Sequence, residues 1–185
     1  MKKTVLFFSR CELTELYGSM SEYLSEEYNI IHVAYSNEEE RILEDRYRIT
    51  NILNFKKLVK SIPENEISIV SIEEIDNLLN ETTYGKFNVN NALQANRTSK
   101  FLSYDDNIRL LKCYYIVWYE IFKQNQISVF VHEPVSLLMN QIAACFCKKY
   151  DAVYTTHILV KGNGQSSFNY MLVDDYNGIA TTLNN

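Results

Sequence analysis

Short unbroken apolar runs alternate with amphipathic segments along most of this chain. The runs lie at 4–8, 29–35, 127–131 and 152–155, and the segments between them carry apolar residues three and four positions apart. Strands that read as continuous apolar runs are buried on both faces, and a helix between two of them implies a parallel pair. The pattern therefore predicts an α/β fold with a mostly parallel central sheet.

The stretch 126–157 is the clearest strand–helix–strand unit. We expect its helix to start at Pro134, because the fixed φ of proline suits the first helical position. His132 and Glu133 then lie at the carboxyl end of a central strand and at the amino end of a helix. In open α/β sheets, ligands bind at that edge.

The opening strand, helix and strand, within residues 4–35, form a second such unit. The other expected elements are helices over 37–61, 73–79 and 89–95, a short strand over 66–72, and a long helix capped by Ser103. Spacings of three and four in that long helix place Trp118 in the core. Together these elements predict one domain over 1–185, a Rossmann-like three-layer sandwich with a mostly parallel central sheet.

Composition narrows the class of protein. Of the 185 residues, 46% are hydrophobic and 22% are charged, as in ordinary soluble domains. A net charge of −5 argues against nucleic-acid binding, which needs a basic face. The sequence has neither the apolar run of a signal peptide nor a stretch near the roughly 18 residues that span a bilayer, so a cytoplasmic location is expected.

No cofactor and no metal are expected from the motifs. The glycine-rich fingerprint of dinucleotide-binding folds is absent from the first turn. The four cysteines lack metal-ligand spacing, and the three histidines lie on separate elements. Reduced, mostly buried thiols are the simplest interpretation of the cysteines.

The first turn offers Ser9 and Arg10 beside the positive end of a helix. Such a turn can hold a phosphate or a carboxylate. The alternative is a solvated turn without a ligand.

The region from about 85 to 180 resembles bacterial capsule and surface-polysaccharide biosynthesis proteins, which are GT-B-like glycosyltransferases. The likeness lies in the order of features: an "ADR" motif, a long helix, a strand that ends in an acid, a helix, a strand and a basic turn. The motif reads Ala95-Asn96-Arg97 here, with Asn in place of the acid. Glu133 stands at the strand-end acid, and the basic turn survives as His157 and Lys161.

This resemblance implies the N-terminal, acceptor-side half of a glycosyltransferase. It further implies a sugar acceptor as ligand, a nucleotide sugar bound through a C-terminal domain beyond this chain, an inactive isolated domain, and a peripheral contact with the membrane. The competing hypothesis is a non-catalytic binding or regulatory module. An esterase is disfavoured because the sequence lacks a G-x-S-x-G motif.

Glu133 is the strongest candidate for the general base that takes the proton of an acceptor hydroxyl. The dipole of the following helix stabilises its anion and keeps His132 neutral, so the imidazole is a second candidate base. Alternation along the strand should send the two side chains to opposite sides. Alternatively, Glu133 is a helix cap and His132 a satisfied core histidine.

Arg10 and Arg97 are candidates for binding anionic substrate groups through paired hydrogen bonds. Each has a structural alternative, an ion pair with an acidic neighbour such as Glu12 or Asp105. His157 and Lys161 are expected just past a strand end, in a glycine-bearing turn that can approach a ligand.

Overall fold

The computed structural model describes residues 2–82, 87–96, 98–135, 137–159 and 166–170, with 157–159 and 166–170 described through their backbone alone. Its sheet has the order β3-β2-β1-β4-β5-β6. The strands are β1 (Thr4–Ser9), β2 (Asn29–Ala34), β3 (Ile52–Asn54), β4 (Ile127–His132), β5 (Val153–Leu159) and β6 (Ser166–Tyr170). The first five are parallel and β6 is antiparallel to β5, which confirms the predicted α/β class and Rossmann-like architecture.

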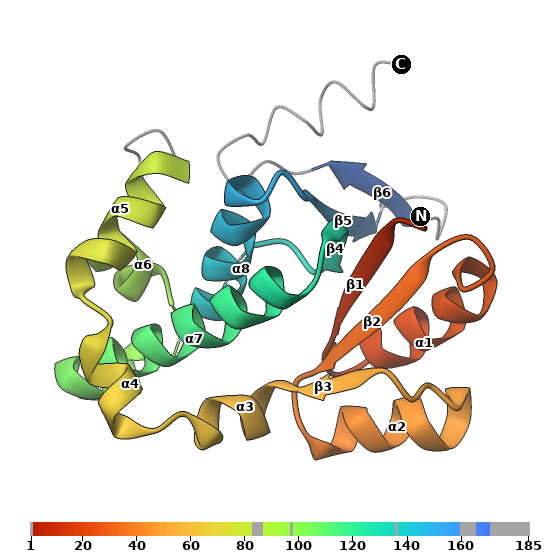
Figure 1. Cartoon of the computed structure of the whole chain (residues 1–185), viewed down its shortest axis with the longest axis horizontal. Helices are drawn as coiled ribbons and strands as arrows, with labels where there is room; N and C mark the ends of the chain where they lie inside the picture. The colour runs from red at the N-terminus through yellow and green to blue at the C-terminus, as the bar shows by residue number, and fades with distance from the viewer. Residues whose placement is uncertain (1, 83–86, 97, 136, 160–165, 171–185) are drawn as a thin grey trace.

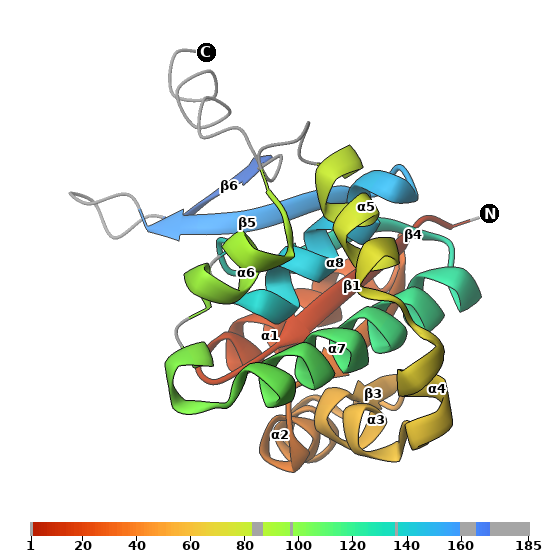
Figure 2. The ribbon, with the colours of Figure 1, turned by 90° about the vertical axis from the view of Figure 1, so that its left-hand side faces the viewer.

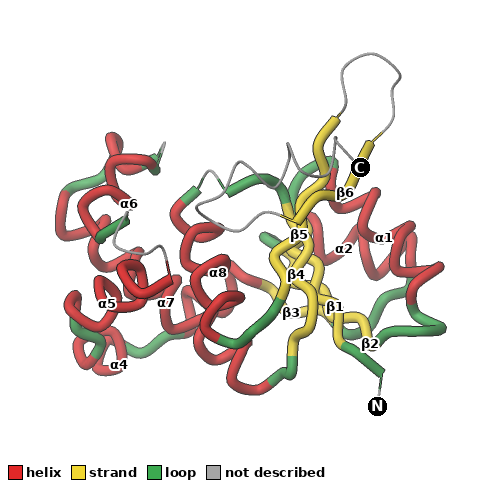
Figure 3. The backbone as a smooth tube through the Cα atoms, turned by 90° about the horizontal axis from the view of Figure 1, so that it is seen from above, coloured by secondary structure: helices red, strands yellow, loops and turns green. Residues whose placement is uncertain are grey.

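The helices form one layer on each face of the sheet (Figures 1 and 2). They are α1 (Leu13–Leu24), α2 (Asn37–Tyr47), α3 (Phe55–Ser61), α4 (Glu64–Ile69), α5 (Ile72–Thr82), α6 (Val89–Ala95), the 3-10 helix η1 (Ser99–Phe101), α7 (Tyr104–Gln124) and α8 (Leu138–Lys149). Figure 3 shows α1 and α2 on one side of the sheet and α4 to α8 on the other. Within the described chain, no helix is both long enough and apolar enough to cross a membrane.

The larger core lies between the sheet and α7 and α8. Trp118 of α7 is fully buried, its ring packs edge-on against Phe8 of β1, and its Nε1 donates to the carbonyl of Met139 at 2.9 Å. Ser103 caps α7 as predicted, because its hydroxyl accepts from the backbone N–H of Asp106. The predicted helix over 89–95 is confirmed as α6.

The prediction of one helix over 37–61 is wrong. Helix α2 ends at Tyr47, where Arg48 takes the left-handed conformation with φ 53°. A short strand, β3, follows and pairs with β2, and Asn54 then caps α3 by accepting from the N–H of Lys57. The β-branched residues between the two helices favour the extended backbone that the sheet edge requires.

The strand expected over 66–72 is not formed, because α4 continues to Ile69 and α5 begins at Ile72. Polar and apolar residues alternate along this short segment, which is also the pattern of a strand. Pro63 at the N-cap and acidic residues in the first turn favour a helix. The segment has one buried apolar residue, Ile67, while Ile69 is exposed. A helix that buries one side chain needs no neighbouring strand.

The expected start of α8 at Pro134 is also wrong, because the helix begins at Leu138. Leu137 is extended, with φ −122° and ψ 153°. The chain uses the residues after β4 to pass from the plane of the sheet to the helix layer. Pro134 lies in that connection and not in the helix.

Candidate functional site

The sheet changes winding direction between β1 and β4. The chain leaves β1 for β2 on one side, and reaches β4 on the other side only after β3 and the intervening helices. The helices α1 and α8, which follow β1 and β4, consequently lie on opposite faces of the sheet (Figure 3). In doubly wound sheets, ligands bind outside the carboxyl ends of the strands at this switch point.

Arg10 follows β1 and Glu133 follows β4, and their side chains meet across the switch point. Arg10 Nη1 donates to Glu133 Oε1 at 3.0 Å, and each side chain is 29% exposed. The Tyr154 hydroxyl also donates to the Glu133 carbonyl at 2.8 Å. Two residues that sequence analysis proposed separately therefore form one half-buried ion pair. The proposed pairing of Arg10 with Glu12 is not the one found.

The turn after β1 holds Arg10 through an unusual backbone conformation. Cys11 has φ 50°, which L-residues other than Asn and Asp rarely adopt. Its N–H donates to Glu39 Oε1 at 3.1 Å, and Glu39 also accepts from the N–H of Ser36 as part of the α2 capping box. A strained residue fixed by a partner from a distant segment is typical of functional turns.

Tyr35 and Lys56 belong to the same rim, although sequence analysis did not select them. The guanidinium carbon of Arg10 lies 5.4 Å from the Tyr35 ring centroid, and Lys56 Nζ lies 4.5 Å from it. Tyr35 directly follows β2, so its position after a buried strand could have identified it as a residue of this rim. Two cations beside one ring give this rim a positive character around Glu133.

His132 is completely buried at the end of β4. Its Nε2 lies 3.5 Å from Glu133 Oε1, which is too long for a good hydrogen bond, and neither ring nitrogen has a hydrogen-bond partner. Because Glu133 lies beyond the last residue of the strand, alternation no longer applies and the two side chains converge, contrary to the expectation. Burial lowers the pKa of His132, so the imidazole is neutral.

Glu133 is a firmly ionised carboxylate. The N–H dipole of the neutral His132 ring, whose Nε2 lies 3.5 Å from Oε1, and the positive guanidinium of Arg10 lower the pKa of Glu133 to about 2, although burial acts in the opposite direction. It is not the cap of α8, whose N-cap is Leu137. The carboxylate is therefore an anion at every physiological pH, a strong hydrogen-bond acceptor and a weak base.

Several buried polar groups near the two strand ends have no hydrogen-bond partner. They are Arg10 Nε, Thr14 Oγ1 in the first turn of α1, both nitrogens of His132, the amide of Asn140 and Oε1 of Gln141 in the first turn of α8. Leaving such a group unsatisfied costs about 1–3 kcal/mol, so native proteins do so rarely. Their concentration beside one sheet edge is typical of a polar ligand site.

The other predicted site residues whose side chains the structure describes use their polar groups elsewhere. Ser9 uses its hydroxyl on the buried His32, with 3.1 Å between Oγ and Nδ1. Asn96 uses its amide protons within its own loop, on Thr98 and Ser99. Arg97 and Lys161 lie outside the described residues.

His157 was expected just past a strand end. It lies instead inside β5, opposite Phe168 of β6. Strand β5 continues to Leu159 because the unexpected strand β6 pairs along it. The polar composition of the segment hid this edge hairpin from sequence analysis.

Among the described residues, no cluster of three or more His, Cys, Asp or Glu side chains is placed to hold a metal ion. All four cysteines are thiols outside any disulfide, and three of them are buried, as expected. No protein-family model matches this sequence, and no curated protein matches it significantly.

Proposed function

We propose that this chain is the acceptor-side domain of a glycosyltransferase that acts on a bacterial surface polysaccharide, with the acceptor sugar held at the switch point. The observation that carries the proposal is the Arg10–Glu133 pair, half-buried where β1 and β4 end. A carboxylate beside a guanidinium offers an acceptor and several donors, which is the complement of adjacent sugar hydroxyls.

In the proposed reaction, Glu133 accepts a hydrogen bond from the attacking hydroxyl of the acceptor. The hydroxyl oxygen forms a bond to the anomeric carbon of a nucleotide sugar as the bond from that carbon to the phosphate oxygen breaks. The nucleotide leaves with the bonding electrons, and the hydroxyl proton passes to Glu133. Because a carboxylate with a pKa of about 2 holds a proton weakly, this transfer belongs to the transition state.

Arg10 has the complementary role of holding and orienting the carboxylate. Its Nε is buried without a partner, so a ligand oxygen that reaches it would remove an energetic cost. In the first turn of α8, the buried amide of Asn140 and the buried Oε1 of Gln141 also lack partners. Polar groups without a hydrogen-bond partner favour a ligand that is rich in hydroxyl groups.

A non-catalytic binding module is the second candidate, and one observation favours it. Glu133 is already neutralised by Arg10 and has a strongly lowered pKa, which suits recognition better than proton abstraction. In that case the same rim binds a sugar or an anion and no transfer follows.

The experiment is a sugar-transfer assay on the complete protein as the cell makes it, with labelled nucleotide sugars and the surface-polysaccharide acceptor. Glu133→Gln should lower turnover by about 10² or more, because proton acceptors contribute that much. Glu64→Gln is the matched control, since Glu64 also pairs with an arginine, Arg109, at 2.8 Å but on an exposed surface. Full turnover by Glu133→Gln would contradict the proposed role, and no turnover by the unmodified protein would favour the binding module.

A further inference from the structure

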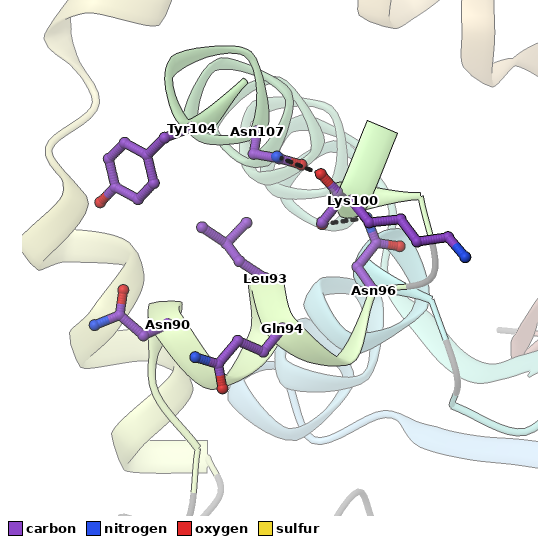
Figure 4. A pocket seen from close by; sticks show the side chains of 8 residues that line it. Asn90, Leu93, Gln94, Asn96, Lys100, Tyr104 and Asn107 are labelled. Atoms are coloured by element: carbon purple, nitrogen blue, oxygen red, sulfur yellow. Dashed lines mark hydrogen bonds between the residues drawn. The ribbon is translucent and has the colours of Figure 1, made fainter. Parts of the chain in front are cut away.

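A cavity of about 630 Å³ lies between α6, η1 and the start of α7 (Figure 4). Its volume is within the range of small-molecule sites, about 300–1,000 Å³. Four of its eight lining side chains are amides, and none is a carboxylate. Among the described residues that line it, Lys100 is the one with a charge. A lining of this kind offers donors and acceptors in balance and little net charge.

The two amides on the α6 side are free to bind. Asn90 and Gln94 are four positions apart, so they share one face of the helix, and both are exposed. Figure 4 shows both amides on the α6 wall of the cavity, with Leu93 between them and α7. A side-chain amide presents two donors and an acceptor, so this wall can pair with neighbouring hydroxyl groups.

The opposite wall is rigid and also has an unused polar atom. Asn107 is 6% exposed, and its Nδ2 donates to the carbonyls of Ser99 and Ser103 at 3.0 and 2.9 Å. Its Oδ1 has no hydrogen-bond partner. These bonds hold η1 against the first turn of α7, so the cavity is pre-formed.

Tyr104 supplies an aromatic surface at one end of the cavity. Its side chain is 62% exposed, at the first residue of α7, and Figure 4 shows the ring across the cavity from Asn90. An exposed ring combines a large apolar face with a polar hydroxyl, which suits the C–H face of a sugar ring.

We infer that this cavity is a second binding site, for a neutral polyhydroxylated ligand such as a segment of a carbohydrate chain. A nucleotide would bring more negative charge than Lys100 can match, and a peptide would need apolar pockets beyond Leu93 and the Tyr104 ring. The inference stands apart from the switch-point proposal, because it uses neither Arg10 nor Glu133.

The test is binding of the purified chain to an array of neutral bacterial oligosaccharides, followed by calorimetry with the strongest binder. Tyr104→Ala and the double variant Asn90→Ala/Gln94→Ala should each weaken binding about tenfold, because the first removes the stacking ring and the second removes two hydrogen-bonding amides. Tyr104→Phe should bind as the unmodified chain does, because it keeps the ring.

Matched controls are available beside each changed residue. Asn91→Ala changes an exposed amide on the same helix, and Phe101→Ala removes a more exposed ring, and neither residue lines the cavity. Both should retain full affinity. Three results would overturn the inference: no binding to any neutral oligosaccharide, binding lost in Glu133→Gln but unchanged in the cavity variants, or uridine monophosphate binding that the cavity variants abolish.

Discussion

At the residue scale, the low pKa of Glu133 is the property most open to direct measurement. Carboxyl-carbon NMR titration should find this pKa at about 2. Arg10→Met should raise it, because the variant removes the guanidinium that stabilises the anion. A pKa near 4.5 in the unmodified chain, or no change in Arg10→Met, would contradict the ion pair.

His32 supplies a second prediction, on stability. Burial lowers its pKa to about 4, while its ring lies between the hydroxyls of Ser9 and Ser21. As pH falls from about 6.5 towards 4, the unfolded chain takes up a proton that the folded chain does not. The free energy of unfolding should therefore fall by up to about 1.4 kcal/mol per pH unit for this residue.

Urea unfolding between pH 7.5 and 5, together with NMR titration of the His32 ring, checks this. A His32 pKa near 6.5 in the folded chain would refute the burial argument. The direction would also be wrong if the folded chain became more stable over that interval.

Sequence analysis identified the site's individual residues better than their partners. Glu133 and Arg10 were both selected because they follow apolar runs that read as buried strands. Their pairing depends on which strands are adjacent, and local patterns do not encode this for two residues 123 positions apart. Asn140 and Gln141 were overlooked because polar residues in a mostly apolar helix give no sign that they lack partners.

At the scale of elements, the packing of α1 on α2 leaves no room for a side chain at Gly18. A Cβ built there would overlap the Tyr47 ring. Gly18→Ala should therefore lower the free energy of unfolding by about 1–3 kcal/mol, as overpacking does. Urea denaturation measures this directly.

The matched control uses the Tyr47→Ala background. With the ring absent, the same Gly18→Ala change should stabilise the chain by up to about 1 kcal/mol, because alanine is the better helix former. Destabilisation of equal size in both backgrounds would exclude the Tyr47 contact as the cause.

The predictions of helices and strands were wrong where the sequence patterns were short or ambiguous. Long periodic segments such as α7 were predicted with their cap, because many turns repeat one apolar face. Strand β3 has three residues and α4 has six, too few for a period to be recognised. The start of α8 was predicted wrongly because proline at position 134 suits the first residue of a helix. In the structure, an extended connection precedes the helix, which begins at Leu138.

At the scale of the whole molecule, the parallel sheet could be predicted from apolar runs separated by helical patterns. The antiparallel edge strand β6 could not be predicted, because its sequence lacks an apolar run. The order of strands places the ends of β1 and β4 side by side, and the proposed acceptor site depends on this adjacency.

A double-mutant cycle with Arg10→Met and Glu133→Gln, measured by urea unfolding at pH 7, tests that adjacency most directly. We expect a coupling energy of about 1 kcal/mol for this half-buried pair, and a clearly smaller coupling for the exposed Arg109–Glu64 pair in a parallel cycle. A coupling at Arg10 and Glu133 no larger than that of the exposed pair would contradict the proposed site.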